Sequence, residues 1–172
     1  MPLKSFAFEV KQLTEQGQFS GLASTYGNTD QQNDVVMPGA FTRTLSDAGK
    51  QRPLLMGHST PVGLVTLTDS ATGLLAEGKL SLGVQVGKDA YTLLKDGVIR
   101  GLSIGFQTVK EQVVGEVRQL LELKLFEVSL VVFPANEMAL VTGVKSASSR
   151  QDTIDTFAAA LRELKEFNRR NS

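Results

Sequence analysis

The hydrophobic positions of this chain follow a two-residue period over most of its length. Residues 101–106 show this period clearly, because three apolar side chains alternate with Ser103 and Gly105. Such alternation is typical of a half-buried strand, and a glycine inside a strand lets a ligand or another backbone approach closely. Further β-like runs cover residues 5–13, 18–26, 62–68, 73–82, 108–125 and 139–144. The pattern therefore predicts many short strands.

Helical spacing is confined to three stretches. Pro38 is suited to begin a helix that runs to about residue 48, with Gly49 ending it. A second helix is predicted over residues 86–97, where Gly97 suits the C-terminal end. The third is an amphipathic helix over about residues 152–168, which follows a polar linker at residues 145–151. With few helices among many strands, we predict a mainly β protein with peripheral helices, in the α+β class.

Near residue 125, the apolar residues switch from odd-numbered to even-numbered positions. Odd positions are apolar up to Leu125, whereas even positions are apolar from Phe126 to Val132. A flat strand cannot bury both sets, because a slip of one residue turns every side chain to the other face. We therefore expect a β-bulge, bend or strand break at Leu125–Phe126, and Glu127 is the side chain that it re-aims.

The predicted organisation is one β domain at residues 1–144, the linker at 145–151 and the C-terminal amphipathic helix at 152–172. The apolar face of this helix is too large to leave in water. It must pack on the β domain of its own chain or on another chain. We predict a homo-oligomer, such as a dimer, that forms through the helix, with binding to scaffold or capsid protein as the alternative. The residues of this face are Ile154, Phe157, Leu161, Leu164 and Phe167.

Composition excludes several classes of binding partner and of catalytic chemistry. The chain has 172 residues, with 18 basic and 18 acidic side chains and no cysteine. A neutral balance offers no electrostatic footprint for nucleic acid or an anionic membrane. Without cysteine, disulfides and thiolate chemistry are excluded. No apolar run is long enough to span a bilayer and no signal peptide is recognisable, so we expect a soluble cytoplasmic protein.

His58 is the only histidine in the chain and lies between a short apolar run and a turn. A structural zinc site with several His or Cys ligands cannot be built from this composition. A weak site made of one histidine and carboxylates is conceivable but disfavoured, and we expect no metal and no cofactor. Two interpretations of His58 stay open: a partly buried core histidine with one hydrogen-bonded nitrogen, or a general base.

Ser103, His58 and Glu127 are the candidates for nucleophilic catalysis. Acyl transfer by a serine needs an imidazole to take its proton and often a third group that orients the imidazole. Ser103 also fits an ordinary surface position in a strand, and Ser129 is a competing nucleophile because it shares the strand face of Glu127. Residues 101–105 match G-x-S-x-G, but the β alternation continues beyond them, which argues against the strand-to-helix elbow of the esterases.

Four blocks of the sequence, which occur in family order, resemble the tailed-phage prohead protease family, the capsid-maturation serine proteases related to herpesvirus assemblin-type enzymes. The resemblance covers about residues 6–144. Asn33 stands where the family often has glycine, which bears on a loop rather than on the chemistry. The blocks are residues 34–41 (DVVMPGAF), 54–58 (LLMGH), 101–106 (GLSIGF) and 127–136 (EVSLVVFPAN).

The resemblance implies a closed, mostly antiparallel, herpesvirus-protease-like β-barrel of about six or seven strands. It assigns His58 as general base and acid, Ser103 as nucleophile and Glu127 as the residue that orients His58. The implied enzyme is a serine endopeptidase without metal or cofactor. The oxyanion donors are not assigned, and backbone amides near Ser103 or Gly105, or the Arg100 side chain, are candidates.

The implied substrates are the scaffolding segment of the major capsid protein, the scaffold and the protease itself. The enzyme would act inside the immature capsid, or prohead, in the cytoplasm of the host cell. An alternative is a non-enzymatic β-barrel that binds capsid or scaffold protein. Such a protein would keep the core pattern but would not need Ser103 and Glu127.

Overall fold

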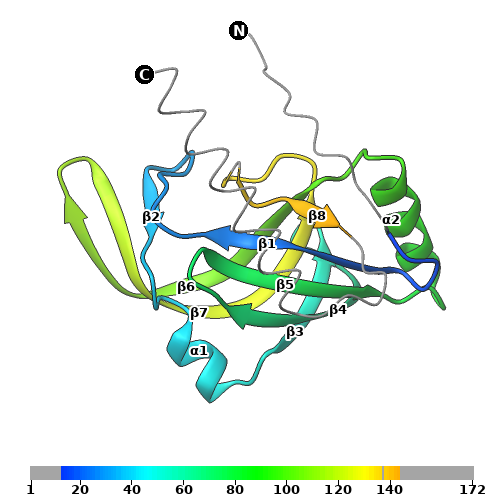
Figure 1. Cartoon of the computed structure of the whole chain (residues 1–172), viewed down its shortest axis with the longest axis horizontal. Helices are drawn as coiled ribbons and strands as arrows, with labels where there is room; N and C mark the ends of the chain where they lie inside the picture. The colour runs from blue at the N-terminus through cyan, green and yellow to red at the C-terminus, as the bar shows by residue number, and fades with distance from the viewer. Residues whose placement is uncertain (1–12, 137, 144–172) are drawn as a thin grey trace, which may run out of the picture.

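One curled β-sheet carries most of the described structure (Figure 1). The computed structural model describes residues 13–136 and 138–143. The elements follow one another as β1 (Gln18–Thr25), β2 (Asp34–Val36), α1 (Thr42–Asp47), β3 (Gln51–Met56), β4 (Thr60–Asp69), β5 (Gly73–Leu80), α2 (Gln85–Lys95), β6 (Gly101–Val114), β7 (Val117–Val131) and β8 (Val141–Gly143). The predicted mainly β architecture with peripheral helices is therefore confirmed.

The expected closed barrel is wrong, because the sheet is an open, curled half-barrel. Its strands follow the order β2-β7-β3-β4-β5-β1-β8, and β6 pairs only with β7. Among the described residues, the outer edge of β6 meets the chain before β8 through one isolated bridge, between Gly101 and Leu140. This single bridge is not a continuous strand pair and does not close the sheet into a barrel. β8 itself spans only three residues and pairs with β1. The sheet has eight strands in the described residues, and the herpesvirus-protease-like fold stays a prediction.

β7 is the strand that brings the candidate site together. It pairs antiparallel with β6 on one edge, and parallel with β2 and then β3 along the other. Residues 101–106 and the first half of 108–125 form one long strand, β6, rather than two. β6 and β7 turn at Gly115 (φ 65°) into a hairpin whose tip projects from the sheet at the left of Figure 1.

The helices differ from their expected bounds mainly at one end. α1 begins at Thr42 rather than Pro38, because Gly39 has a φ of 88°, which is incompatible with an α-helix. It ends just before Gly49, as predicted. α2 confirms the second predicted helix. The expected strand at residues 5–13 lies almost wholly outside the described residues, as do the linker at 145–151, the C-terminal helix at 152–172 and its proposed contacts.

The apolar side chains of β7 and β6 are buried less regularly than their alternation predicts. Leu102, Val128 and Leu130 are fully buried in the core. Phe126, expected to point inward, is 48% exposed, and the Lys124 ammonium lies 5.6 Å from the centre of its ring. Ile104 and Phe106 are only partly buried and, together with Ser103, line a surface cleft. Ile104 and Phe106, which the alternation places in the core, thus line the cleft.

A buried arginine joins α1 and β3 to the centre of β7. Arg52 donates hydrogen bonds to the carbonyls of Leu125 (3.0 Å) and Thr44 (3.0 Å), and also to those of Ala48, Gly49 and Gln51 near the end of α1. The Leu125 amide in turn donates to the Thr44 hydroxyl at 3.1 Å. The amide and the carbonyl of Leu125 are therefore both hydrogen-bonded to side chains. Leu125 is also the residue after which the apolar residues switch from odd to even positions.

We expect Arg52→Met to lower the free energy of unfolding by about 3 kcal/mol, because it leaves several buried carbonyls without donors. Urea denaturation measures this change. Arg43→Met is the matched control: Arg43 is 70% exposed, and its ion pairs with Asp47 and Glu122 are of a kind that contributes under about 1 kcal/mol. Equal losses in the two variants would contradict the role given to Arg52.

Candidate active site

A β-bulge in β7 aims Glu127 toward β6. Gly105 pairs with Glu127, whereas the next residue, Phe106, pairs with Leu125, so that Phe126 is the extra residue. This is the bulge predicted from the parity change, and it lies at the predicted position. Beyond it, Ser129 pairs with Ser103 across the two strands. The bulge therefore places Glu127 close to the serine of β6.

His58 meets Glu127 from the other edge of β7. It lies two residues after β3, where Gly57 and His58 both have positive φ angles of 58° and 61°. The Gly57 amide donates to the Leu130 carbonyl at 3.0 Å, which anchors this turn to β7. The His58 Nδ1 atom then lies 2.7 Å from Glu127 Oε1. Because Nδ1 is engaged, Nε2 is the ring nitrogen left for proton transfer.

Ser129 completes a buried cluster with these two residues. Its hydroxyl donates to Glu127 Oε2 at 2.7 Å and accepts a hydrogen bond from the His58 amide at 3.0 Å. Its side chain is fully buried. A hydroxyl whose proton is committed to a carboxylate and which no substrate can reach is poorly suited to attack, so the geometry disfavours Ser129 as the nucleophile.

Ser103 and His58 line the same cleft, which has a volume of about 250 Å³. Ser103 is half-buried, and within the described residues its hydroxyl makes no hydrogen bond to the imidazole. Catalytic hydrogen bonds are often long without substrate and tighten in the complex. Apart from His58 and Ser103, four polar side chains line the cleft: Ser24, Asp30, Gln32 and Asn136. The rest of the lining is apolar and consists of Ala23, Val36, Leu102, Ile104, Phe106, Leu120, Phe133 and Ala135.

Gly105 makes room for the Glu127 carboxylate. A Cβ atom at this position would lie 2.2 Å from Glu127 Oε1, far inside contact distance. The sequence pattern indicated a close approach beside Ser103, and the structure shows that a side chain of the neighbouring strand makes it. Glycine is thus required opposite the oxygen that binds His58.

We therefore expect Gly105→Ala to displace Glu127 and lower the free energy of unfolding by about 1–3 kcal/mol through overpacking. Since His58 is the sole histidine, NMR of its ring protons reports the displacement directly. Gly83→Ala is the control, because nothing lies within 4 Å of a Cβ there. An unchanged imidazole spectrum in Gly105→Ala would refute this account of the glycine.

An ion pair ties the first residue of β2 to β7. The Arg118 guanidinium donates to both carboxylate oxygens of Asp34, at 2.7 and 2.5 Å, and the Asp34 side chain is 3% exposed. The hydrogen bond to Asp34 raises the pKa of Arg118, so the guanidinium stays charged. Val36 of β2 lines the cleft, as do Asp30 and Gln32 from the loop before it.

Arg100, one of the candidate oxyanion donors, does not line the cleft. Its Nε donates to the Gly97 carbonyl at 2.8 Å, at the end of α2. The backbone amides near Ser103 and Gly105 stay as candidates for this role. Within the described residues, no group of three or more His, Asp or Glu side chains is placed to hold a metal ion, and no helix is long and apolar enough to cross a membrane.

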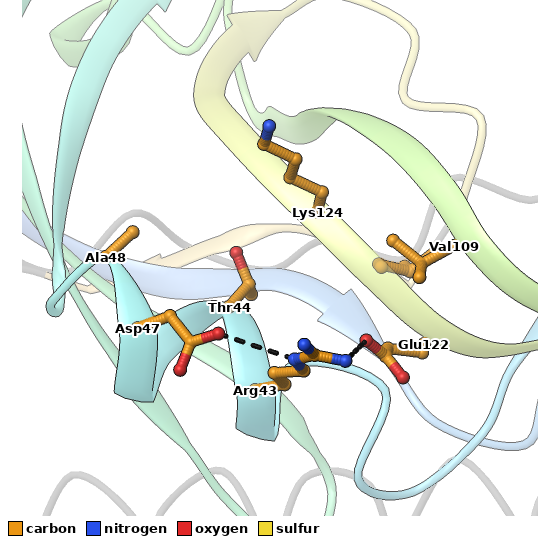
Figure 2. Close-up of a pocket in the computed structure, with 8 residues that line it drawn as sticks. Arg43, Thr44, Asp47, Ala48, Val109, Glu122 and Lys124 are labelled. Carbon is orange, nitrogen blue, oxygen red and sulfur yellow. Dashed lines mark hydrogen bonds and ion pairs between the residues drawn. The ribbon is translucent and has the colours of Figure 1, made fainter.

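A second hollow, of about 280 Å³, lies between α1 and β7 (Figure 2). Arg43 crosses it to contact Asp47 and Glu122, at 3.4 and 3.2 Å. The only hydroxyl in its lining, on Thr44, already accepts hydrogen bonds from Leu125 and Arg52. The hydroxyl of this hollow is therefore already hydrogen-bonded, and both of its carboxylates pair with Arg43.

Comparisons with known proteins identify the family of this chain. Residues 6–154 match the family model of the caudovirus prohead serine protease. The chain is 32% identical to the prohead protease of Enterobacteria phage HK97 over 140 residues, which cover 77% of this chain and 62% of that protein. It is 34% identical over 155 residues to the capsid polyprotein of Pseudomonas phage PAJU2, covering 83% of this chain and 22% of the polyprotein.

The chain thus spans less than two thirds of the length of either relative. The family model nevertheless covers most of this chain, including His58, Ser103 and Glu127. The chain belongs to the caudovirus prohead serine protease family.

Proposed function

We propose that this chain is a serine endopeptidase that matures phage proheads by cleaving the scaffolding segment of the major capsid protein, the scaffold and itself. The observation that carries the proposal is the 2.7 Å contact between His58 Nδ1 and Glu127, beside a cleft that His58 shares with Ser103. A non-enzymatic capsid-binding module needs no such contact. Family membership supports the same reaction class.

The proposed reaction proceeds through an acyl-enzyme. Ser103 Oγ attacks the scissile carbonyl while His58 Nε2 takes its proton, and Glu127 stabilises the imidazolium that forms. The imidazolium then protonates the leaving amine, so the peptide C–N bond breaks and an ester to Ser103 remains. Water, deprotonated by His58, hydrolyses this ester and regenerates the serine hydroxyl. No step requires a metal or a cofactor.

The proposed partners are the major capsid protein and its scaffolding segment. The match to part of a capsid polyprotein supports an association with capsid protein. The proposed place of action is the inside of the immature capsid in the host cell. Self-association through the C-terminal helix remains a proposal, since that helix lies outside the described residues.

Co-expression with the cognate capsid protein, followed by intact-mass analysis of both chains, tests the function. We expect the capsid protein to lose the mass of its scaffolding segment and the protease to shorten by self-cleavage. Both chains at full mass in proheads that have assembled would overturn the proposal.

A further inference from the structure

We infer that Ser129 is a positioning residue that holds both partners of the His58–Glu127 contact, an inference that rests on the proposed function. Ser129 itself is not expected to touch the substrate, because its side chain is fully buried. Its hydroxyl is the one side-chain group that contacts both the backbone of His58 and the carboxylate of Glu127 in the described residues.

The direction of the two hydrogen bonds is set by their chemistry. A serine hydroxyl has one proton and two lone pairs. A carboxylate only accepts, so the proton of Ser129 goes to Glu127 Oε2 at 2.7 Å. The His58 amide only donates, so it binds a lone pair of the same oxygen at 3.0 Å. Burial keeps water from replacing either bond, which makes the hydroxyl a fixed link between β7 and the turn after β3.

The His58 backbone needs such a link. Its φ of 61° lies in the left-handed region, which residues other than glycine adopt reluctantly. Two hydrogen bonds from backbone amides tie this turn to β7: the Gly57 amide donates to the Leu130 carbonyl, and the His58 amide donates to Ser129. Of these, only the bond to Ser129 holds the backbone of His58 itself. Without the hydroxyl, the turn is free to relax toward negative φ, and the imidazole moves with its backbone.

The Glu127 carboxylate is held at both of its oxygens. Oε1 contacts His58 Nδ1 and Oε2 accepts the Ser129 proton, so rotation of the carboxylate is blocked. Removing Ser129 leaves Oε2 without a donor and lets the carboxylate turn away from the ring.

The test is NMR spectroscopy of the full chain in a Ser103→Ala background, which prevents self-cleavage. We expect Ser129→Ala to speed hydrogen exchange of the His58 amide at least about tenfold and to shift or broaden the Nδ1 proton signal of this sole imidazole. Ser129→Thr, which keeps the hydroxyl, should restore both. Val128→Ala is the matched control, since it truncates a neighbouring buried side chain that makes no polar contact with the site.

In the active protein, we expect Ser129→Ala to lower kcat about tenfold to a hundredfold with little change in KM, and Val128→Ala to leave both nearly unchanged. If Ser129→Ala does not fold, the near-isosteric Ser129→Cys, whose thiol is a weak donor, takes its place. Unchanged exchange and imidazole signals, or equal changes in Val128→Ala, would overturn the inference. The NMR results do not depend on proteolysis, so an inactive wild-type chain would count only against the proposed function.

Discussion

A Ser103→Ala variant is expected to fold like the wild-type chain and to leave the capsid protein, the scaffold and itself uncleaved. The change removes only a half-buried hydroxyl that has no hydrogen-bond partner among the side chains of the described residues. Stability should therefore change by less than about 0.5 kcal/mol. Cleavage should fall by a factor of about 10⁴ or more, because no acyl-enzyme can form without the nucleophile.

Intact-mass analysis after co-expression with the capsid protein measures the effect. Ser59→Ala is the matched control, since Ser59 follows His58 directly and carries an exposed hydroxyl. We expect this control to cleave normally. Cleavage by Ser103→Ala at the wild-type rate would show that another residue is the nucleophile.

The second large effect is expected from Glu127→Gln, which keeps the shape of the side chain but removes its charge. An amide cannot stabilise the imidazolium that forms when His58 takes the proton of Ser103, and its NH₂ group can bind Nδ1 in the wrong tautomer. We expect kcat to fall at least about a hundredfold and KM to change little, because the lost interaction strengthens in the transition state.

Steady-state cleavage of a scaffold-derived peptide separates kcat from KM. Glu122→Gln provides the control on the same strand, because Glu122 pairs with Arg43 at the α1 hollow rather than with His58. If both glutamine variants lose the same activity, the charge of Glu127 has no special role in the reaction.

Much of the fold could be predicted from local pattern. The alternation of side chains specifies strands because each strand residue faces one side of the sheet, and this needs no knowledge of neighbours. The parity change at Leu125–Phe126 also indicated where the bulge that aims Glu127 lies, since one flat strand cannot turn both sets of apolar side chains inward. The candidates His58, Ser103 and Glu127 were identified from scarce residue types and from the family resemblance.

The contacts within the site could not be predicted in this way. Ser129 was interpreted as a rival nucleophile, because its place on the face of Glu127 is visible in the sequence but its bond to the His58 amide is not. The one available signal was its spacing of two residues from Glu127. In the same way, Gly105 indicated free space beside Ser103. The sequence did not indicate that the Glu127 carboxylate of the neighbouring strand fills this space.

Most strands, the bulge and the scarcity of histidine follow from neighbouring residues or from composition, so they can be predicted without the fold. Three features depend instead on how the chain folds: the open sheet, the hydrogen bond from Arg52 to the carbonyl of Leu125, and the contact of His58 with Glu127 over a separation of 69 residues. These features depend on which strands pair and in which register. Register depends on interactions across the whole sheet, so it cannot be predicted from one local stretch of sequence.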